Sequence, residues 1–161
     1  MSTDHRHLAN AAWEAMLSAH ATLMKQFAAE DIWAEASIRE YDVLYTLSKC
    51  AAPIRLSELN RHVLLSQPAL SRMVDRLVVR GLVERQADLA DGRGVRLSLT
   101  AVGRHCQRRI GGRHARSVTR AMTAALDAAE MRQLAAICRK LADHERAPRT
   151  SSETAPSELS A

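Results

Sequence analysis

Cysteine, aromatic residues and long hydrophobic runs are all scarce in this 161-residue chain. Its three cysteines are too few and too widely spaced for a disulfide framework or a CxxC zinc site. No apolar run reaches the roughly 18 residues that a membrane-spanning helix needs. The beginning of the chain also has no continuous apolar stretch typical of a secretory signal. We therefore expect a cytoplasmic protein with no membrane partner.

The sequence signatures of common enzymatic and metal sites are absent as well. The chain contains neither a GxxxxGK[ST] phosphate loop nor a GxSxG nucleophile motif. Its seven histidines show no HxxxH or HExxH spacing. We therefore expect no enzymatic activity, no catalytic residue, no cofactor and no metal. The cysteines are expected to be small buried hydrophobic residues.

Positive charge is concentrated in the middle of the chain. Hydrophobic residues make up 47% of the sequence and charged residues 25%, which is typical of one globular domain. Residues 53–120 contain fourteen arginines, no lysine and only five acidic residues. The planar guanidinium group suits phosphate and guanine, so this pattern indicates a nucleic-acid partner. A merely solvated surface is the alternative.

Four amphipathic helices are predicted from apolar residues that recur every three to four positions. Their ranges are 8–29, 38–49, 101–125 and 128–145. Ser37 and Glu40 have the spacing of a capping box before the second helix, and Thr100 and Asp127 stand at the corresponding positions before the last two. The Gly111–Gly112 pair is either a close packing point or a bend.

The centre of the chain predicts two short helices followed by a hairpin. Ser66 is expected to cap the second of these helices, with Pro68 in its first turn and Gly81 at its end. Residues 82–86 and 95–99 are predicted to be the two strands of the hairpin. A helix-turn-helix followed directly by a hairpin is a winged helix-turn-helix. The predicted fold class is therefore mainly α with a small β-hairpin wing.

The second short helix combines an apolar face with a short polar face. Short side chains at its N-terminal end would allow a close approach to base edges in a major groove. Gln67 could pair with adenine, Arg72 with guanine or phosphate, and Arg76 with phosphate. At the wing tip, Arg93 could enter a minor groove. The candidate DNA-binding residues are Ser66, Gln67, Pro68, Ala69, Ser71, Arg72, Arg76, Asp91, Gly92 and Arg93.

These residues resemble the DNA-binding module of the MarR family, the multiple-antibiotic-resistance-type regulators, over about residues 38–104. The resemblance rests on Ser66 to Arg72, Val74 to Leu77, Arg80 to Val83, Asp91-x-Arg93, Leu99-Thr100 and Gly103-Arg104. Gly92 departs from the two consecutive basic residues that are common in the family's wing. Only one strong minor-groove cation is therefore present.

The resemblance implies a homodimer in which two winged lobes bind a pseudo-palindromic operator on double-stranded DNA. It also implies a repressor that is released by a small molecule. The implied organisation is an N-terminal dimerisation helix in residues 1–36, the winged DNA-binding lobe in 37–100 and C-terminal dimerisation helices in 101–146. Residues 147–161 lack apolar periodicity and are expected to be a disordered tail.

The sequence leaves two questions open, namely whether the chain has an effector site and whether its function is something other than DNA binding. The few rings outside the arginine-rich segment cluster in two neighbouring helices, where they could bind a phenolic or aromatic effector. The candidate pocket residues are Trp13, His20, Met24, Tyr41 and Tyr45, for which core and dimer packing is the alternative role. The alternative function is a winged-helix protein-interaction module without DNA binding. Such a module predicts a neutral helix face, against which Arg72 and Arg76 argue.

Overall fold

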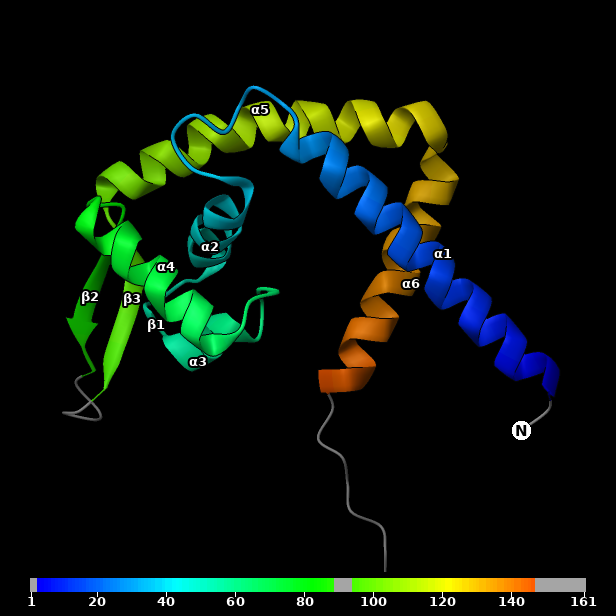
Figure 1. Cartoon of the computed structure of the whole chain (residues 1–161), viewed down its shortest axis with the longest axis horizontal. Helices are drawn as coiled ribbons and strands as arrows, with labels where there is room; N and C mark the ends of the chain where they lie inside the picture. Colours follow the sequence, from blue (N-terminus) through cyan, green and yellow to red (C-terminus); the bar gives the residue numbers. More distant parts are fainter. Residues whose placement is uncertain (1–2, 89–93, 147–161) are drawn as a thin grey trace, which may run out of the picture. The chain divides into compact units, whose positions relative to one another are not determined.

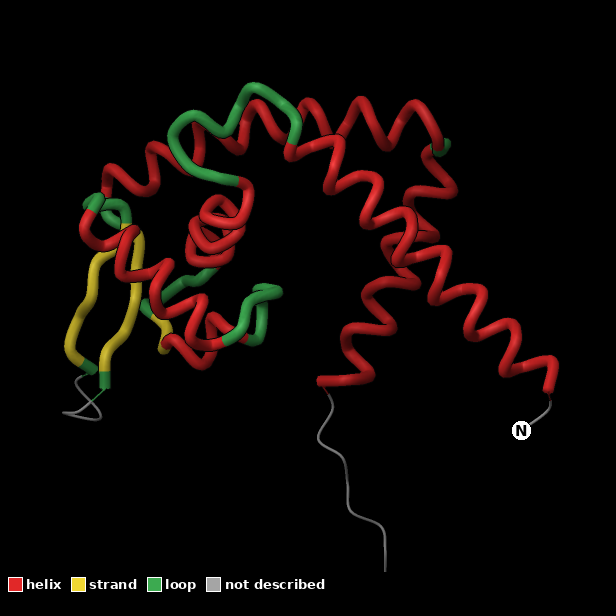
Figure 2. The backbone as a smooth tube through the Cα atoms, in the orientation of Figure 1, coloured by secondary structure: helices red, strands yellow, loops and turns green. Residues whose placement is uncertain are grey.

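The computed structural model describes residues 3–88 and 94–146, which form two compact units divided after Arg120. The first unit contains α1 (Thr3–Ala28), α2 (Ile38–Lys49), β1 (Ile54–Arg55), α3 (Leu56–Asn60), α4 (Gln67–Val79), β2 (Val83–Ala87), β3 (Val95–Leu99) and most of α5 (Ala101–Ala125) (Figure 1). The second unit contains the end of α5 and α6 (Ala128–Arg146). Helices therefore dominate the described residues and strands are confined to a small sheet, as predicted (Figure 2).

The helix starts predicted at Ser37, Thr100 and Asp127 are confirmed by hydrogen bonds, whereas α1 begins at Thr3, five residues earlier than predicted. The Ser37 backbone N–H donates to the Glu40 carboxylate over 2.9 Å, and the Glu40 N–H donates back to the Ser37 hydroxyl. At α5, the Thr100 hydroxyl accepts from the N–H of Gly103 over 2.9 Å. Asp127 accepts from the first turn of α6 in the same way. These groups satisfy N–H donors that a helix cannot satisfy itself.

The wing belongs to a three-stranded antiparallel sheet with the order β1-β3-β2. The predicted hairpin is present, although β2 begins one residue later than expected, at Val83. The first strand was not predicted, because two residues are too few to show an alternating pattern. Ile54 and Arg55 pair with Leu97 and Arg96 of β3, so β1 attaches the wing to the start of α3.

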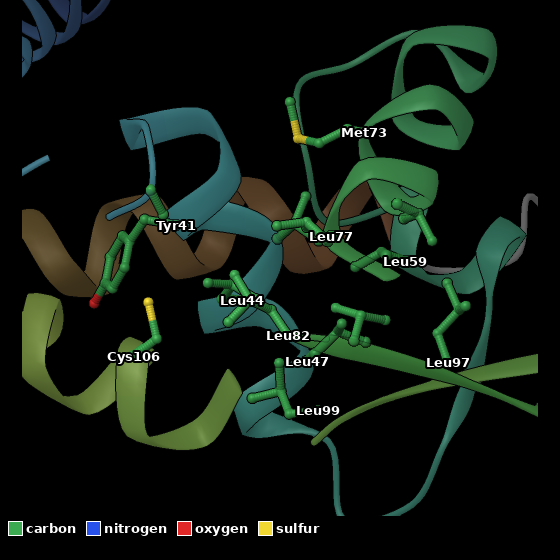
Figure 3. Close-up of a cluster of buried hydrophobic side chains, with 14 of the residues drawn as sticks. Tyr41, Leu44, Leu47, Leu59, Met73, Leu77, Leu82, Leu97, Leu99 and Cys106 are labelled. Carbon is green, nitrogen blue, oxygen red and sulfur yellow. The ribbon is translucent and has the colours of Figure 1, made fainter. Parts of the chain in front are cut away.

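The core of the first unit lies where α2, α3 and α4 meet the sheet. Leu44, Leu59 and Leu77 are fully buried, and Leu97 of β3 joins them (Figure 3). Leu70 of α4 is fully buried in the same core. Each of these leucines contributes about 1.5–3 kcal/mol through burial of its side chain. Helix α4 thus turns one apolar stripe inward while the rest of its surface remains available for function.

The C-terminal end of α4 packs directly against the start of α5. Gly81 has φ +67°, and the N–H groups of Gly81 and Leu82 donate to the carbonyls of Val78 and Leu77, which is the Schellman pattern. A Cβ atom at Gly103 would lie 1.8 Å from the Leu82 carbonyl oxygen. Only glycine at position 103 therefore allows the main chain of α5 to pack this closely against Leu82.

A buried carboxylate holds the base of the wing. Asp88 is only 2% exposed, and its Oδ2 atom accepts from Nε and Nη2 of Arg55 over 2.9 and 2.7 Å. Its Oδ1 atom lies 3.1 Å from Nε of Arg96. The Asp88 N–H also donates to the Gly94 carbonyl over 2.9 Å. This cluster ties all the strands of the sheet together at the point where the described part of the wing ends.

Other expectations are resolved by the structure in different ways. Helix α5 continues through Gly111 and Gly112, and a Cβ atom at Gly111 would lie 3.0 Å from the Tyr41 hydroxyl, so Gly111 is a packing point. Cys106 is buried as expected, whereas the prediction was wrong for Cys138, which is exposed on α6. Residues 147–161 lie outside the described residues. Across the described ranges, no helix combines the length and apolarity needed to cross a membrane.

We predict opposite effects of alanine at two glycines of α5. Gly103→Ala should lower the free energy of unfolding by about 1–3 kcal/mol, because its methyl group would overlap the main chain at Leu82. Gly112→Ala meets nothing within 4 Å and should raise it by about 1 kcal/mol through helix propensity. Denaturant unfolding of both variants checks this, and equal effects would contradict the close contact at Gly103.

We also predict that the charge of Asp88 stabilises the sheet. Asp88→Asn should lower the free energy of unfolding by about 1–3 kcal/mol, because two guanidinium groups would lose a buried charged acceptor. The matched control is Asp75→Asn, which removes an exposed ion pair with Arg85 and should cost less than about 1 kcal/mol. Thermal and urea unfolding compare the two, and a larger loss in the control would refute the assignment.

Candidate nucleic-acid interface

The outward face of α4 carries the residues predicted to contact DNA. Gln67, Pro68, Arg72 and Arg76 are exposed, and Ala69 and Ser71 are half-buried at the edge of the same face. The opposite face is buried against the sheet and α3. Packing of the apolar stripe therefore brings the predicted α4 residues onto one side of one helix.

The N-terminal end of α4 lacks features that would compete with an anion. Ser66 occupies the N-cap position, but its hydroxyl makes no capping hydrogen bond, so the predicted cap was wrong in this respect. The Ser66 carbonyl accepts from the N–H of Leu70 over 2.9 Å, as in any helix start. The first turn contains Pro68 and no acidic residue. Its uncapped N–H groups and the positive end of the helix dipole favour a negatively charged group.

Two arginines on this face are not neutralised within the described part of the chain. Neither Arg72 nor Arg76 forms an ion pair there, and both side chains are exposed. Asp75 lies between them in sequence, but its carboxylate pairs with Arg85 of β2. Both guanidinium groups therefore retain their full charge for a partner.

The predicted wing-tip residues Asp91, Gly92 and Arg93 lie outside the described residues. The structure does describe the base of the wing on both sides of them. The Asp88 N–H bonds to the Gly94 carbonyl, and Val95 begins the pairing of β3 with β2. The described residues on both sides, Asp88 and Val95, are therefore tied into the sheet.

A cleft of about 840 Å³ lies between α1, α2 and the α3–α4 connection. Three of the five predicted pocket residues line it, namely His20, Met24 and Tyr45. The Lys49 ammonium lies 4.9 Å from the centre of the Tyr45 ring, and Arg39 adds a second permanent positive charge. The cleft thus combines an aromatic face, an apolar thioether and basic groups.

The other two predicted pocket residues lie elsewhere. Trp13 is 56% exposed on α1 and does not line the cleft that contains His20, Met24 and Tyr45. Tyr41 is 5% exposed, packs against Trp33 and His114, and lines a second cleft of about 680 Å³ between α2 and α5. Burial raises the pKa of the Tyr41 hydroxyl, although a hydrogen bond with Gln107 opposes the effect.

Asp42 lines both clefts, and no other acidic residue is among the described residues that line either of them. Partial burial raises the pKa of its carboxyl group above the usual value, while the neighbouring His114 and His20 lower it. An anion bound in either cleft would meet this carboxylate as well as the basic groups. Asp42 therefore limits how close to α2 a ligand carboxylate can lie.

Sequence reasoning missed the residues that hold the interface in place. Asp88 and Arg55 are 33 positions apart, and Arg80 contacts Glu40 across 40 positions. No local spacing signals such pairs, because they form only after the helices and the sheet have packed. The arginine excess of the segment was visible in the sequence, but the division of its arginines between structure and recognition was not.

Comparison with known proteins agrees with this architecture. The MarR family model matches residues 37–95, which run from the cap of α2 to the first residue of β3. The multiple antibiotic resistance protein MarR of Escherichia coli (strain K12) is 36% identical over 89 residues. This match covers 53% of the present chain and 61% of that protein, so the chain spans less than two thirds of the curated relative.

Two solved structures extend the likeness beyond the winged lobe. A mutant of MarR from Escherichia coli complexed with operator DNA is 25% identical, with a TM-score of 0.65 over 88% of this chain and 99% of that one. The PcaV transcriptional regulator from Streptomyces coelicolor in complex with its natural ligand is 29% identical, with a TM-score of 0.62 over 89% and 94%. The family model, the curated relative and the solved structures agree in showing that this chain is similar to MarR family regulators.

Proposed function

We propose that the protein is a transcriptional regulator that binds double-stranded DNA sequence-specifically through α4. The observation that carries this proposal is the exposed N-terminal face of α4, where Gln67, Ser71 and Arg72 lie together beside an uncapped helix end. Short side chains allow close approach to base edges, and Arg72 offers paired donors to guanine. A mutant of Escherichia coli MarR, a protein of similar fold, has been solved with operator DNA, which supports DNA binding by this chain.

The proposed active form is a homodimer that binds a pseudo-palindromic operator. In α1, Leu8, Trp13 and Leu17 are 68%, 56% and 46% exposed, and in α6, Ile137 and Leu141 are 50% and 56% exposed. Each helix therefore has an apolar face that a single copy leaves in contact with water, and a second copy would cover such faces. Two lobes related by a twofold axis require half-sites about 10 base pairs apart.

The proposed effector is a small aromatic or phenolic anion bound in the cleft between α1, α2 and the α3–α4 connection. Tyr45 and Met24 would contact its ring, and Lys49 and Arg39 would balance its charge. PcaV, a relative of similar fold, has been solved with its natural ligand. Repression would be relieved if the ligand favours a lobe arrangement that fits the operator poorly, and a hundred-fold release requires about 2.7 kcal/mol of differential affinity.

A protein-interaction module without DNA binding is the second candidate, and the charge of α4 speaks against it. A surface that contacts other proteins is commonly depleted in charge at its centre. The centre of this face instead carries Arg72 and Arg76 without acidic partners among the described residues.

DNA binding is tested by fluorescence anisotropy with a labelled duplex of the intergenic DNA upstream of the protein's own gene. Binding should be saturable, tighter than to a scrambled duplex, and weaker at the higher of two salt concentrations, because phosphate contacts release counterions. Absence of binding to either duplex at low salt would refute the proposal and favour the interaction module.

Two arginines of α4 should respond differently in this assay. Arg72→Ala should cost about 1–3 kcal/mol on the specific duplex and relax preference at one base pair. Arg76→Ala should weaken binding to specific and scrambled duplexes alike and reduce the salt slope by about 1 per bound arm. If Arg72→Ala leaves affinity and preference unchanged, the orientation of α4 in the groove is wrong.

The effector site is tested by titrating benzoate and hydroxybenzoates into the protein–duplex complex. At least one acid should release the duplex, and Tyr45→Ala should shift the midpoint to roughly three- to ten-fold higher concentration through loss of a ring contact. Ser48→Ala is the matched control on α2, because Ser48 does not line this cleft. A wild-type response in Tyr45→Ala would exclude this cleft as the site.

A further inference from the structure

Arg80 lies at the C-terminal end of α4, whereas the residues proposed to read DNA bases lie toward its N-terminal end. It is the C-cap residue of the helix, and its side chain is 40% exposed. Its Nη1 atom donates to Oε1 of Glu40 over 3.1 Å, and its Nη2 atom donates to the main-chain carbonyl of Glu35. One guanidinium group therefore connects α4 both to the segment that joins α1 to α2 and to the first turn of α2.

Glu40 is a well-ordered acceptor for this contact. Its Oε2 atom already accepts the Ser37 N–H over 2.9 Å in the capping box that begins α2, and its side chain is 14% exposed. Partial burial would raise the pKa of Glu40, but hydrogen bonds from Ser37 and Arg80 outweigh it and lower the pKa below the usual value. Glu40 is thus ionised at neutral pH, and one carboxylate joins the start of α2 to the end of α4.

The segment that Arg80 contacts is itself packed against the rest of the unit. Ala36 is 2% exposed, and the indole N–H of Trp33 donates to the Phe27 carbonyl over 2.6 Å. The Glu35 carboxylate pairs with Arg109 of α5, while its carbonyl is the one that binds Arg80. A contact to this segment is therefore a contact to α1, α2 and α5 together.

The hydrogen bonds of Thr100 hold the chain that follows α4 rather than the helix itself. Thr100 accepts the N–H of Gly103 and donates to the carbonyl of Gly81, but these bonds act beyond the last turn of the helix. Helix α4 has thirteen residues and is about 20 Å long, so a small rotation at its C-terminal end displaces its N-terminal end appreciably. Of the described contacts of α4, that of Arg80 acts on the helix end farthest from the bases.

Glu40 also stands beside residues of the proposed effector cleft. It is preceded in α2 by Arg39 and followed by Asp42, and both of these line the cleft. Resting on the proposed DNA-binding function, we propose that Arg80 is a positioning residue that ties α4 to the α1–α2 connection, so that the cleft wall and the DNA-reading helix move as one body. Arg80 acts through the orientation of α4 and does not itself touch DNA.

The variant Glu40→Gln distinguishes the proposed positioning role of Arg80 from a general effect of net charge on affinity for DNA. The substitution removes one negative charge, which by itself would favour binding to any duplex, and glutamine retains the capping box. Loss of the Arg80 contact should instead weaken binding to the specific duplex, by roughly three- to thirty-fold, the range for residues that couple distant sites. Arg80→Gln should weaken specific binding by a similar factor, and the double variant should be no weaker than the poorer single variant.

The matched control is Glu35→Gln, which changes the net charge equally but keeps the carbonyl that binds Arg80. It should retain the ratio of specific to scrambled affinity, whereas Glu40→Gln and Arg80→Gln should lower this ratio at nearly unchanged melting temperature. A purely structural role would lower the melting temperature and leave the ratio intact, which would overturn the inference. Specific binding by Glu40→Gln as tight as wild type would also overturn it. Equal wild-type binding to both duplexes would instead refute the proposed function on which it rests.

Discussion

Burial of the apolar stripe on α4 is the constraint on which the rest of the arrangement depends. Leu70 and Leu77 are fully buried, with Met73 and Val74 between them. Because successive residues are 100° apart around a helix, this burial leaves Arg72 and Arg76 no direction except outward. The outward direction of these side chains is therefore a consequence of core packing.

The arginine excess of the sequence serves two purposes that composition alone cannot separate. Several arginines are bound by acidic partners within the fold, namely Arg55 and Arg96 by Asp88, Arg80 by Glu40, Arg85 by Asp75, and Arg109 by Glu35. Those paired with the buried Asp88 are structural, because separation would leave a carboxylate without its counterions. The positive charge available to a nucleic acid is consequently smaller than the arginine count indicates.

Local and long-range features differed in how far the sequence predicted them. The helix starts at Ser37 and Thr100 and the left-handed Gly81 were predictable, since each depends on residues within about four positions. Strand β1, the Asp88 cluster and the Arg80 contacts were not, because they join segments more than 30 positions apart. The role of Gly111 required the position of the Tyr41 ring, which no spacing rule supplies.

Helix α2 connects the winged lobe to both clefts, the parts that would have to communicate if the proposed effector releases DNA. It contributes Leu44 and Leu47 to the core of the winged lobe, and Asp42 and Tyr45 to the clefts on its other faces. A ligand alters DNA affinity only to the extent that it binds one arrangement of the helices better than another. Because α2 is close-packed on the lobe side, a ligand cannot displace its cleft side independently. Any shift of α2 must therefore reach α4 through the shared core and the Glu40–Arg80 contact.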